Sequence, residues 1–228
     1  NYVWPFTQTY WVNDISSTYG HPINFDGEED ENSLMQRYKA NRSVEISTIF
    51  REVFGNNQMM SRIRPVLMWT KGWMDMGSRA MLFMDRYYNA RDSRSDISDP
   101  HPINYYFYGA GGSNYWSHGE GSTSTETIWN MGEWNPVNFA ETIYAESAWA
   151  RSFGLAYVTY ESDAHYPTPE TRQVYRDIHW DERMYQESIE HVDAFNMVGG
   201  DLFSFYSLTG HDNSTDWGLY HVYNGLEG

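Results

Sequence analysis

Apolar and polar positions follow one another along the chain in blocks that predict alternating helices and strands. The first helix is predicted over 31–54, because large apolar residues recur there at the spacing of one helix face, and we expect that face to be buried. Gly55 suits the end of this helix. The residues of the predicted buried face are Ile46, Ile49, Phe50, Val53 and Phe54.

Further blocks extend the same alternation to the end of the chain. A parallel sheet with helical crossovers is expected from this order, either as a (β/α) barrel or as an open doubly wound sheet. No GxGxxG pattern follows a strand, which disfavours the nucleotide-binding form of the open sheet. The remaining helices are predicted over 77–91, 136–153 and 169–197, and the strands over 63–69, 103–108, 155–160 and 202–207. In the last helix, the predicted inner face is Tyr185, Ile189, Val192 and Phe195.

Four strands cannot close a standard eight-stranded barrel. We therefore expect the whole chain, 1–228, to be a single domain that forms part of a larger barrel, with the remaining strands in the same or another polypeptide. The long stretch from 109 to about 134 is rich in Gly, Ser and Trp and is predicted to be a loop. Long loops in compact domains usually carry function.

Charge and composition narrow the possible partners. The chain has 15 Lys and Arg against 31 Asp and Glu, a formal net charge of −16, which repels phosphate backbones and anionic lipids. We therefore expect neither a nucleic-acid nor a membrane partner, and no apolar run reaches the ~20 residues that span a bilayer. The chain has no cysteine, which excludes thiolate metal sites and disulfides, and we expect no metal or cofactor.

Aromatic residues make up 18% of the chain, including 10 Trp and 19 Tyr. They form either a large aromatic core or, in part, a groove where sugar rings stack, since Trp and Tyr combine a flat apolar face with a polar tip. The acidic run 26–31 also has two interpretations, a solvated loop leading into a helix N-terminus or a calcium site. Two glycosylation sequons, at Asn41 and Asn213, favour an extracellular location.

Chemistry in parallel α/β folds lies just past the carboxyl ends of the strands. Three segments occupy such places here, namely 108–115, 161–165 and 211–217. Glu161 is the strongest candidate, because a carboxylate after an apolar strand would face the mouth of a barrel. The alternative is that Glu161 caps the next turn or pairs with an arginine.

Several segments resemble the C-terminal portion of clan A-type glycoside-hydrolase-like (β/α)8 barrels found in large secreted bacterial proteins. Asn1-Tyr2-Val3-Trp4 resembles the Asn-Glu-Val-Trp segment that ends the fourth strand of that family, and Tyr160-Glu161-Ser162 resembles the Tyr-Glu-Gly-Gly segment that ends the seventh. The stretches 42–55 and 62–67 resemble the intervening helix and fifth strand. The resemblance implies a TIM-barrel-like fold in which this chain covers about strands 4/5 to 8.

The resemblance also implies roles for particular residues. Glu161 takes the position of the nucleophile of a retaining glycoside hydrolase, and Tyr2 takes the acid/base position, where the family has Glu. A tyrosine, with a reference pKa of about 10, protonates a leaving group poorly, and Ser162-Asp163 replaces the glycine pair. The residues expected to bind the sugar are Tyr106, Tyr108, Trp116, His165 and Trp217.

Two functions follow as expectations. The first is an extracellular glycoside-hydrolase-like domain that acts on or binds polysaccharide, with Glu161 at its site. The second is a non-catalytic structural glycoprotein that assembles into an extracellular layer or filament and forms homo-oligomers. A second carboxyl group close to Glu161 would favour the enzyme, and a large interface between copies would favour the assembly protein.

Overall fold

The computed structural model describes residues 22–70, 74–116, 124–130, 136–163, 174, 177–178, 181–206, 209–210 and 220–221. Four parallel strands form one sheet in the order β1-β2-β3-β4, and helices lie between successive strands along the chain. The predicted α/β class is therefore confirmed. The strands of this sheet are β1 Val66–Trp69, β2 Gly109–Gly112, β3 Ala156–Val158 and β4 Gly200–Leu202.

Six helices and a second pair of strands complete the described elements. The short parallel pair is β5 Thr209–Gly210 with β6 Tyr220–His221. None of the described helices is long and apolar enough to cross a membrane. The helices are α3 Glu31–Phe54, α4 Met74–Tyr87, α5 Ile103–Tyr106, α6 Thr125–Asn130, α7 Pro136–Ser152 and α9 Glu182–Met197.

Contacts divide the chain into two compact units. The first consists of Asn1–Gly111 and Ala148–Ala156, and the second of Gly112–Ser147 and Tyr157–Gly228. In the first unit, the N-terminal half of α3 packs on α4. The buried side chains of this pair include Leu34, Met35, Ala40 and Val44 from α3 and Ala80, Met81, Phe83 and Met84 from α4.

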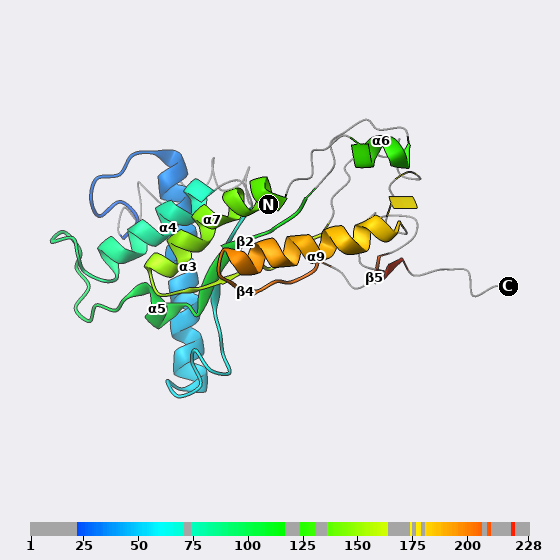
Figure 1. Cartoon of the computed structure of the whole chain (residues 1–228). Helices are drawn as coiled ribbons and strands as arrows, with labels where there is room; N and C mark the ends of the chain where they lie inside the picture. Colours follow the sequence, from blue (N-terminus) through cyan, green and yellow to red (C-terminus); the bar gives the residue numbers. More distant parts are fainter. Residues whose placement is uncertain are drawn as a thin grey trace. The chain divides into compact units, whose positions relative to one another are not determined.

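The orientation of α3 differs from the prediction. Its bounds agree with the predicted 31–54, but the face expected to be buried is exposed in the C-terminal half, which extends beyond α4 (Figure 1). The opposite face packs instead, because the Ser47 hydroxyl donates to the Tyr106 carbonyl and the Arg51 guanidinium donates to the Tyr105 carbonyl. Helical periodicity identified an amphipathic helix correctly, but the choice of buried face was wrong.

The second strand also lies elsewhere than predicted. Ile103–Tyr106 is the short helix α5, and the strand β2 is the glycine-rich Gly109–Gly112, all four residues of which are buried. Tyr108 links the sheet just before β2, since its N–H donates to the Pro65 carbonyl and its carbonyl accepts from Ala156. Glycine inside a strand often marks a place where another part of the molecule approaches the backbone.

In the second unit, the predicted inner face of α9 is only partly correct, since Phe195 is buried and Val192 half-buried. Tyr185 and Ile189 are exposed, whereas Phe195 is buried against Tyr157, with ring centroids 5.0 Å apart. Gly200 begins β4 under the Phe195 ring rather than only ending the helix. The buried side chains of α9 are Met184, Glu187, His191, Ala194 and Phe195.

Candidate functional site

Backbone hydrogen bonds continue the sheet past the carboxyl end of β3. The Glu161 carbonyl accepts from the N–H of Asn114 at 2.9 Å, and the Asp163 carbonyl accepts from the N–H of Trp116 at 3.1 Å. The Ser162 carbonyl accepts from the N–H of Tyr206 at 3.0 Å. The segment 161–163 is thus held between 114–116 on one side and Tyr206 on the other. All of these residues belong to the second unit.

The Glu161 carboxylate lies among phenol side chains. It is half-buried, and the Tyr115 hydroxyl donates a hydrogen bond to it. Burial raises the pKa of Tyr115, and the charge of Glu161 together with this hydrogen bond raises it further. The Tyr115 ring centroid lies 6.2 Å from that of Tyr206, and both Tyr206 and Tyr160 are exposed. The group formed by Glu161, Tyr115, Tyr160 and Tyr206 is called the Glu161 cluster below.

Small polar side chains beneath the Glu161 cluster fix its backbone. The Ser162 hydroxyl donates to Thr159 Oγ1 at 3.1 Å, and Thr159 Oγ1 also accepts from the N–H of Ser204 at 2.8 Å. Ser162, Thr159 and Asp163 are all buried. Polar contacts in a protein interior resist rearrangement, because breaking one leaves a buried group without its partner. The segment that carries Glu161 is therefore held in one conformation.

A second buried chain of hydrogen bonds starts from β3. The Tyr157 hydroxyl donates to Glu146 Oε2 at 3.0 Å and accepts from Asn114 Nδ2 at 3.3 Å. Burial raises the pKa of Tyr157, and the neighbouring Glu146 charge adds to this effect, so the hydroxyl keeps its proton. Glu146, on α7, and Asn114 are buried, so this chain links α7 to the segment before Tyr115.

The residues expected to bind sugar are placed in different surroundings. Tyr106 is buried in the first unit beside Tyr88, and burial raises its pKa to about 12. Tyr108 is half-buried with the Arg64 guanidinium 4.7 Å from its ring centroid. Trp116 belongs to the core of the second unit, where its ring stacks on His191 at 3.7 Å. Tyr2, His165, Trp217 and Asn213 lie outside the described residues.

Sequence reasoning selected Glu161 but missed its neighbours Tyr115 and Tyr206. Tyr115 stands at the end of the segment 108–115, which was singled out because it follows a strand. The position after a strand was therefore the signal that could have identified Tyr115. The sugar-binding residue predicted in this segment is Tyr108 instead. Tyr206 lies within the predicted strand 202–207 and so was not expected to follow a strand, but β4 ends at Leu202.

Asn41, the acceptor of the first sequon, lies in the middle of α3. Its Nδ2 donates to Glu45 Oε1 at 2.9 Å, and its Oδ1 accepts from the Tyr88 hydroxyl. Both ends of the side-chain amide are thus used by neighbours within the first unit. Glycosylation at Asn41 would have to displace the first of these bonds.

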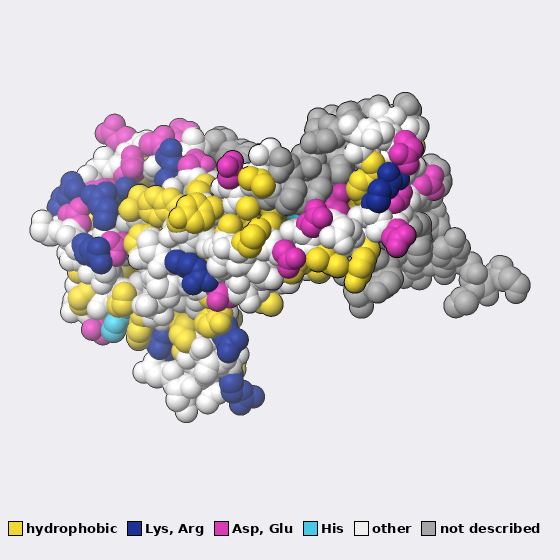
Figure 2. Space-filling view, in the orientation of Figure 1, with side chains coloured by type: hydrophobic (Ala, Val, Ile, Leu, Met, Phe, Trp, Pro, Cys, Tyr) yellow, Lys and Arg dark blue, Asp and Glu magenta, His cyan; other side chains and the backbone are white. Residues whose placement is uncertain are grey.

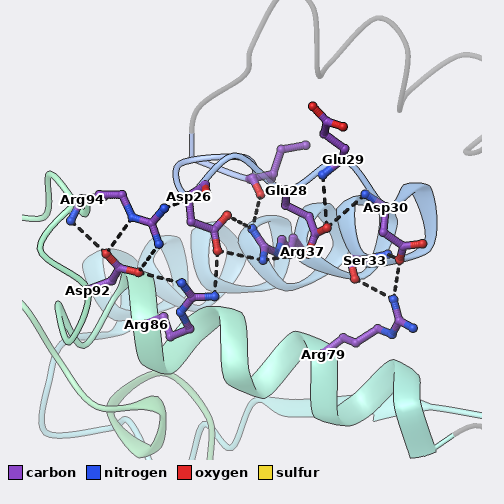
Figure 3. Close-up of polar contacts among 11 residues, drawn as sticks. Asp26, Glu28, Glu29, Asp30, Ser33, Arg37, Arg79, Arg86, Asp92 and Arg94 are labelled. Carbon is purple, nitrogen blue, oxygen red and sulfur yellow. Dashed lines mark hydrogen bonds and ion pairs between the residues drawn. The ribbon is translucent and has the colours of Figure 1, made fainter.

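Arginines neutralise most of the acidic segment before α3 (Figure 3). Asp26 pairs with Arg37 at 2.6 Å and with Arg86 at 2.7 Å, and Arg37 also pairs with Glu28 at 3.1 Å. Acidic and basic side chains gather together around α4 and the following loop on the face shown in Figure 2. Within the described part of the chain, no group of three or more His, Cys, Asp or Glu could hold a metal ion.

Asp30 has a different use, as the N-cap of α3. Its Oδ2 accepts from the N–H of Ser33 at 2.8 Å, and the carboxylate also pairs with Arg79. The cap satisfies one of the free donors at the start of the helix, where a negative charge is also favourable. Asp30 thus has the role expected of an acidic residue at a helix N-terminus. Asp26 and Glu28 are instead paired with arginines.

The pKa shifts in this network predict acid sensitivity. The pKa of Asp92 is lowered by hydrogen bonds from Arg94 and Arg86, and that of Asp30 by hydrogen bonds from Ser33. Burial raises the pKa of Asp26, but Arg37 and Arg86 outweigh it and leave a net lowering. The stability from these groups is present above the normal aspartate value of 3.8 and is lost as the pH falls through the lowered values. Circular dichroism against pH should show unfolding begin below about pH 4; a transition near pH 6 would instead indicate histidines.

No family model, no curated protein and no solved structure matches this chain.

Proposed function

We propose that this chain is an extracellular, glycoside-hydrolase-like domain that binds polysaccharide at the Glu161 cluster without cleaving it. The observation that carries the proposal is the half-exposed Glu161 carboxylate, which lies past the end of a parallel strand and accepts a hydrogen bond from Tyr115. Exposed phenol rings of Tyr160 and Tyr206 belong to the same cluster.

A neutral sugar suits this chemistry. The carboxylate accepts hydrogen bonds from sugar hydroxyls, and phenol rings offer flat apolar faces with a polar edge. The net charge of −16 disfavours anionic ligands such as phosphate esters. The fixed backbone of 161–163 supports binding, because a site held in one conformation loses little entropy when the ligand is bound.

The strand order supports the barrel part of the proposal. Strands β1 to β4 are neighbours in the order of the sequence, as they are in a (β/α)8 barrel, whereas a doubly wound sheet reverses its order at a switch point. We propose that these four strands are the C-terminal part of such a barrel. The remainder would come from the same or another chain.

Binding is favoured over hydrolysis by the partner of Glu161. Retaining hydrolysis needs two carboxyl groups about 5–5.5 Å apart, and the Glu161 carboxylate is hydrogen-bonded by a phenol, Tyr115, with a raised pKa. A phenol of that kind keeps its proton through neutral pH. It orients Glu161 as an acceptor and supplies no acid for a leaving group.

Replacing Glu161 by glutamine tests the proposal. We expect the wild-type chain to be retarded in native gels that contain a soluble polysaccharide such as xylan, β-glucan or glycol chitin. Glu161→Gln should weaken that binding about tenfold or more, because a charged acceptor is lost. Tyr115→Phe should have a smaller effect in the same direction. Glu141→Gln, at an exposed position of α7 in the same unit, is the matched control and should bind normally.

Two outcomes would contradict the proposal. Equal binding by the Glu161→Gln and wild-type chains would place the sugar elsewhere. Release of reducing ends by the wild type that disappears in Glu161→Gln would show a hydrolase instead of a binding domain.

The alternative proposal is a non-catalytic structural glycoprotein that assembles into an extracellular layer or filament. A layer or filament needs at least two different contact surfaces on each copy. Apolar side chains are exposed on both units, including Val53 and Phe54 of α3 and Tyr185 and Met197 of α9. Sedimentation of large polymers by the purified, glycosylated chain would support this alternative, and a species of fixed small size at all concentrations would exclude it.

A further inference from the structure

The C-terminal half of α3 exposes a continuous apolar face. Five large side chains at successive turns are each 39–68% exposed. Phe50 and Phe54 contact each other edge to face, with ring centroids 6.1 Å apart. The members of this surface, called the α3 face below, are Ile46, Ile49, Phe50, Val53 and Phe54.

The α3 face is not needed to hold the helix in the first unit. The opposite side of the same half carries Val44, Ser47 and Arg51, which are turned inward; Ser47 and Arg51 bond to the α5 carbonyls. The Arg51 guanidinium also lies 3.7 Å from the centroid of the Tyr105 ring. The helix is therefore anchored by one side, and the apolar side remains available to a partner.

The size of the α3 face fits a pair of identical helices. The exposed fractions correspond to at most roughly 500 Å² on one copy, when every member is given the area of an aromatic side chain, about 150–250 Å². Such a patch is at the upper end of what a single protein exposes. Two copies placed face to face would bury at most roughly 1,000 Å², which is the size of a weak, reversible interface.

Local charge also permits a second copy. The chain as a whole carries −16, which opposes association between copies. The helix segment 39–54 differs, because apart from the inward-turned Arg51 it carries two basic residues, Lys39 and Arg42, and two acids, Glu45 and Glu52. Arg42 and Glu45 are already paired with each other at the N-terminal edge of the α3 face. The surface that would meet its copy is therefore close to neutral.

We infer that the α3 face is a homodimer interface, in which the C-terminal halves of α3 from two copies pack against each other. A helix face that pairs with its own copy makes an isologous contact, which closes after two subunits. The inference concerns the first unit and does not depend on the Glu161 cluster, so either can fail without the other.

Sedimentation velocity over a wide range of concentration tests the inference. We expect a reversible monomer–dimer equilibrium that shifts toward dimer at high salt, because salt screens the net repulsion while the apolar contact remains. Val53→Glu should weaken dimerisation at least about tenfold. Val53 is the most exposed member of the α3 face, so this variant is expected to fold. Leu82→Glu, at another exposed apolar position, on α4, is the control and should dimerise as the wild type does.

A cross-linking experiment locates the contact independently. Because the chain has no cysteine, Phe50→Cys and Leu82→Cys each introduce a single thiol. A short bis-maleimide should join two Phe50→Cys chains rapidly and leave Leu82→Cys chains monomeric. A wild-type chain that stays monomeric at all concentrations and salts would overturn the inference. So would a dimer that Val53→Glu leaves unchanged, since its contact would lie on another surface.

Discussion

Replacing Asp26 by asparagine is expected to lower the free energy of unfolding by about 2–4 kcal/mol. Asp26 and Arg37 are nearly buried, with 6% and 8% of their side chains exposed, and Asp26 also pairs with Arg86. Removing one charge from a buried pair leaves the other without compensation, which costs more than the pair itself contributes. Arg37 keeps its contacts with Glu28 and the Ile23 carbonyl, which limits the loss.

Urea unfolding at neutral pH measures this effect. Asp75→Asn is the matched control, because Asp75 is exposed and lies 3.8 Å from Arg79 on the same helix. A surface pair of that kind contributes less than about 1 kcal/mol. Equal losses in the two variants would show that the Asp26 network does not hold the first unit together.

The pH dependence gives the Asp26 prediction a second readout. The net effect of its neighbours lowers the pKa of folded Asp26 below its usual 3.8, so its stabilising effect is complete above that value. As the pH falls through the lowered pKa, wild-type Asp26 becomes neutral and resembles asparagine. The stabilities of wild type and Asp26→Asn should therefore converge in acid, and a constant difference down to low pH would contradict the ionic origin.

Replacing Gly200 by alanine is expected to cost about 2–3 kcal/mol, because the added methyl group would overlap a buried ring. A Cβ at this position would lie 2.0 Å from Phe195 Cε1 and 2.2 Å from Cδ1. Phe195 has little room to move away, since it packs on Tyr157 and on Phe203, with ring centroids 5.0 and 5.2 Å away. We therefore expect the substitution to weaken the packing of α9 on β4.

A different glycine separates crowding from backbone conformation. Gly27 has φ +84°, but a Cβ added there would meet no atom within 4 Å, so Gly27→Ala tests conformation alone. This variant should cost about 1 kcal/mol. Combining Gly200→Ala with Phe195→Leu should recover part of the loss, as expected for residues in direct contact. A Gly200→Ala variant no less stable than Gly27→Ala would show that the ring is free to move.

Local signals determined the bounds of α3. The sequence predicted a helix over 31–54, and the structure has Glu31–Phe54, because both ends depend on neighbours in the chain. Asp30 caps the start by accepting from Ser33, and Gly55 ends the helix with φ 85°. The alternation of helices and strands likewise revealed the α/β class, since apolar periodicity is a property of each segment.

Other features required the tertiary structure. Periodicity shows that α3 has an apolar face but not which face packs, and the choice was made by the distant carbonyls of Tyr105 and Tyr106. The segment Ile103–Tyr106 has the aromatic composition typical of a strand, yet it forms the helix α5. The buried strand is the glycine-rich β2. Which segment becomes a buried strand depends on the elements that cover the sheet, and the local pattern of a segment does not encode that packing.

The sequence also determined one part of the candidate site, and the tertiary structure determined the rest. The sequence by itself determined that Glu161 follows the third strand, because a polar residue directly after an apolar run marks a strand end. Only the tertiary structure decided that Tyr115 donates to Glu161 and that Tyr206 lies beside Tyr115. Those residues are far apart in the chain and meet because parallel strands bring their carboxyl ends to one edge of the sheet. Sequence position thus sets which groups follow each strand, and strand pairing sets which of them become neighbours.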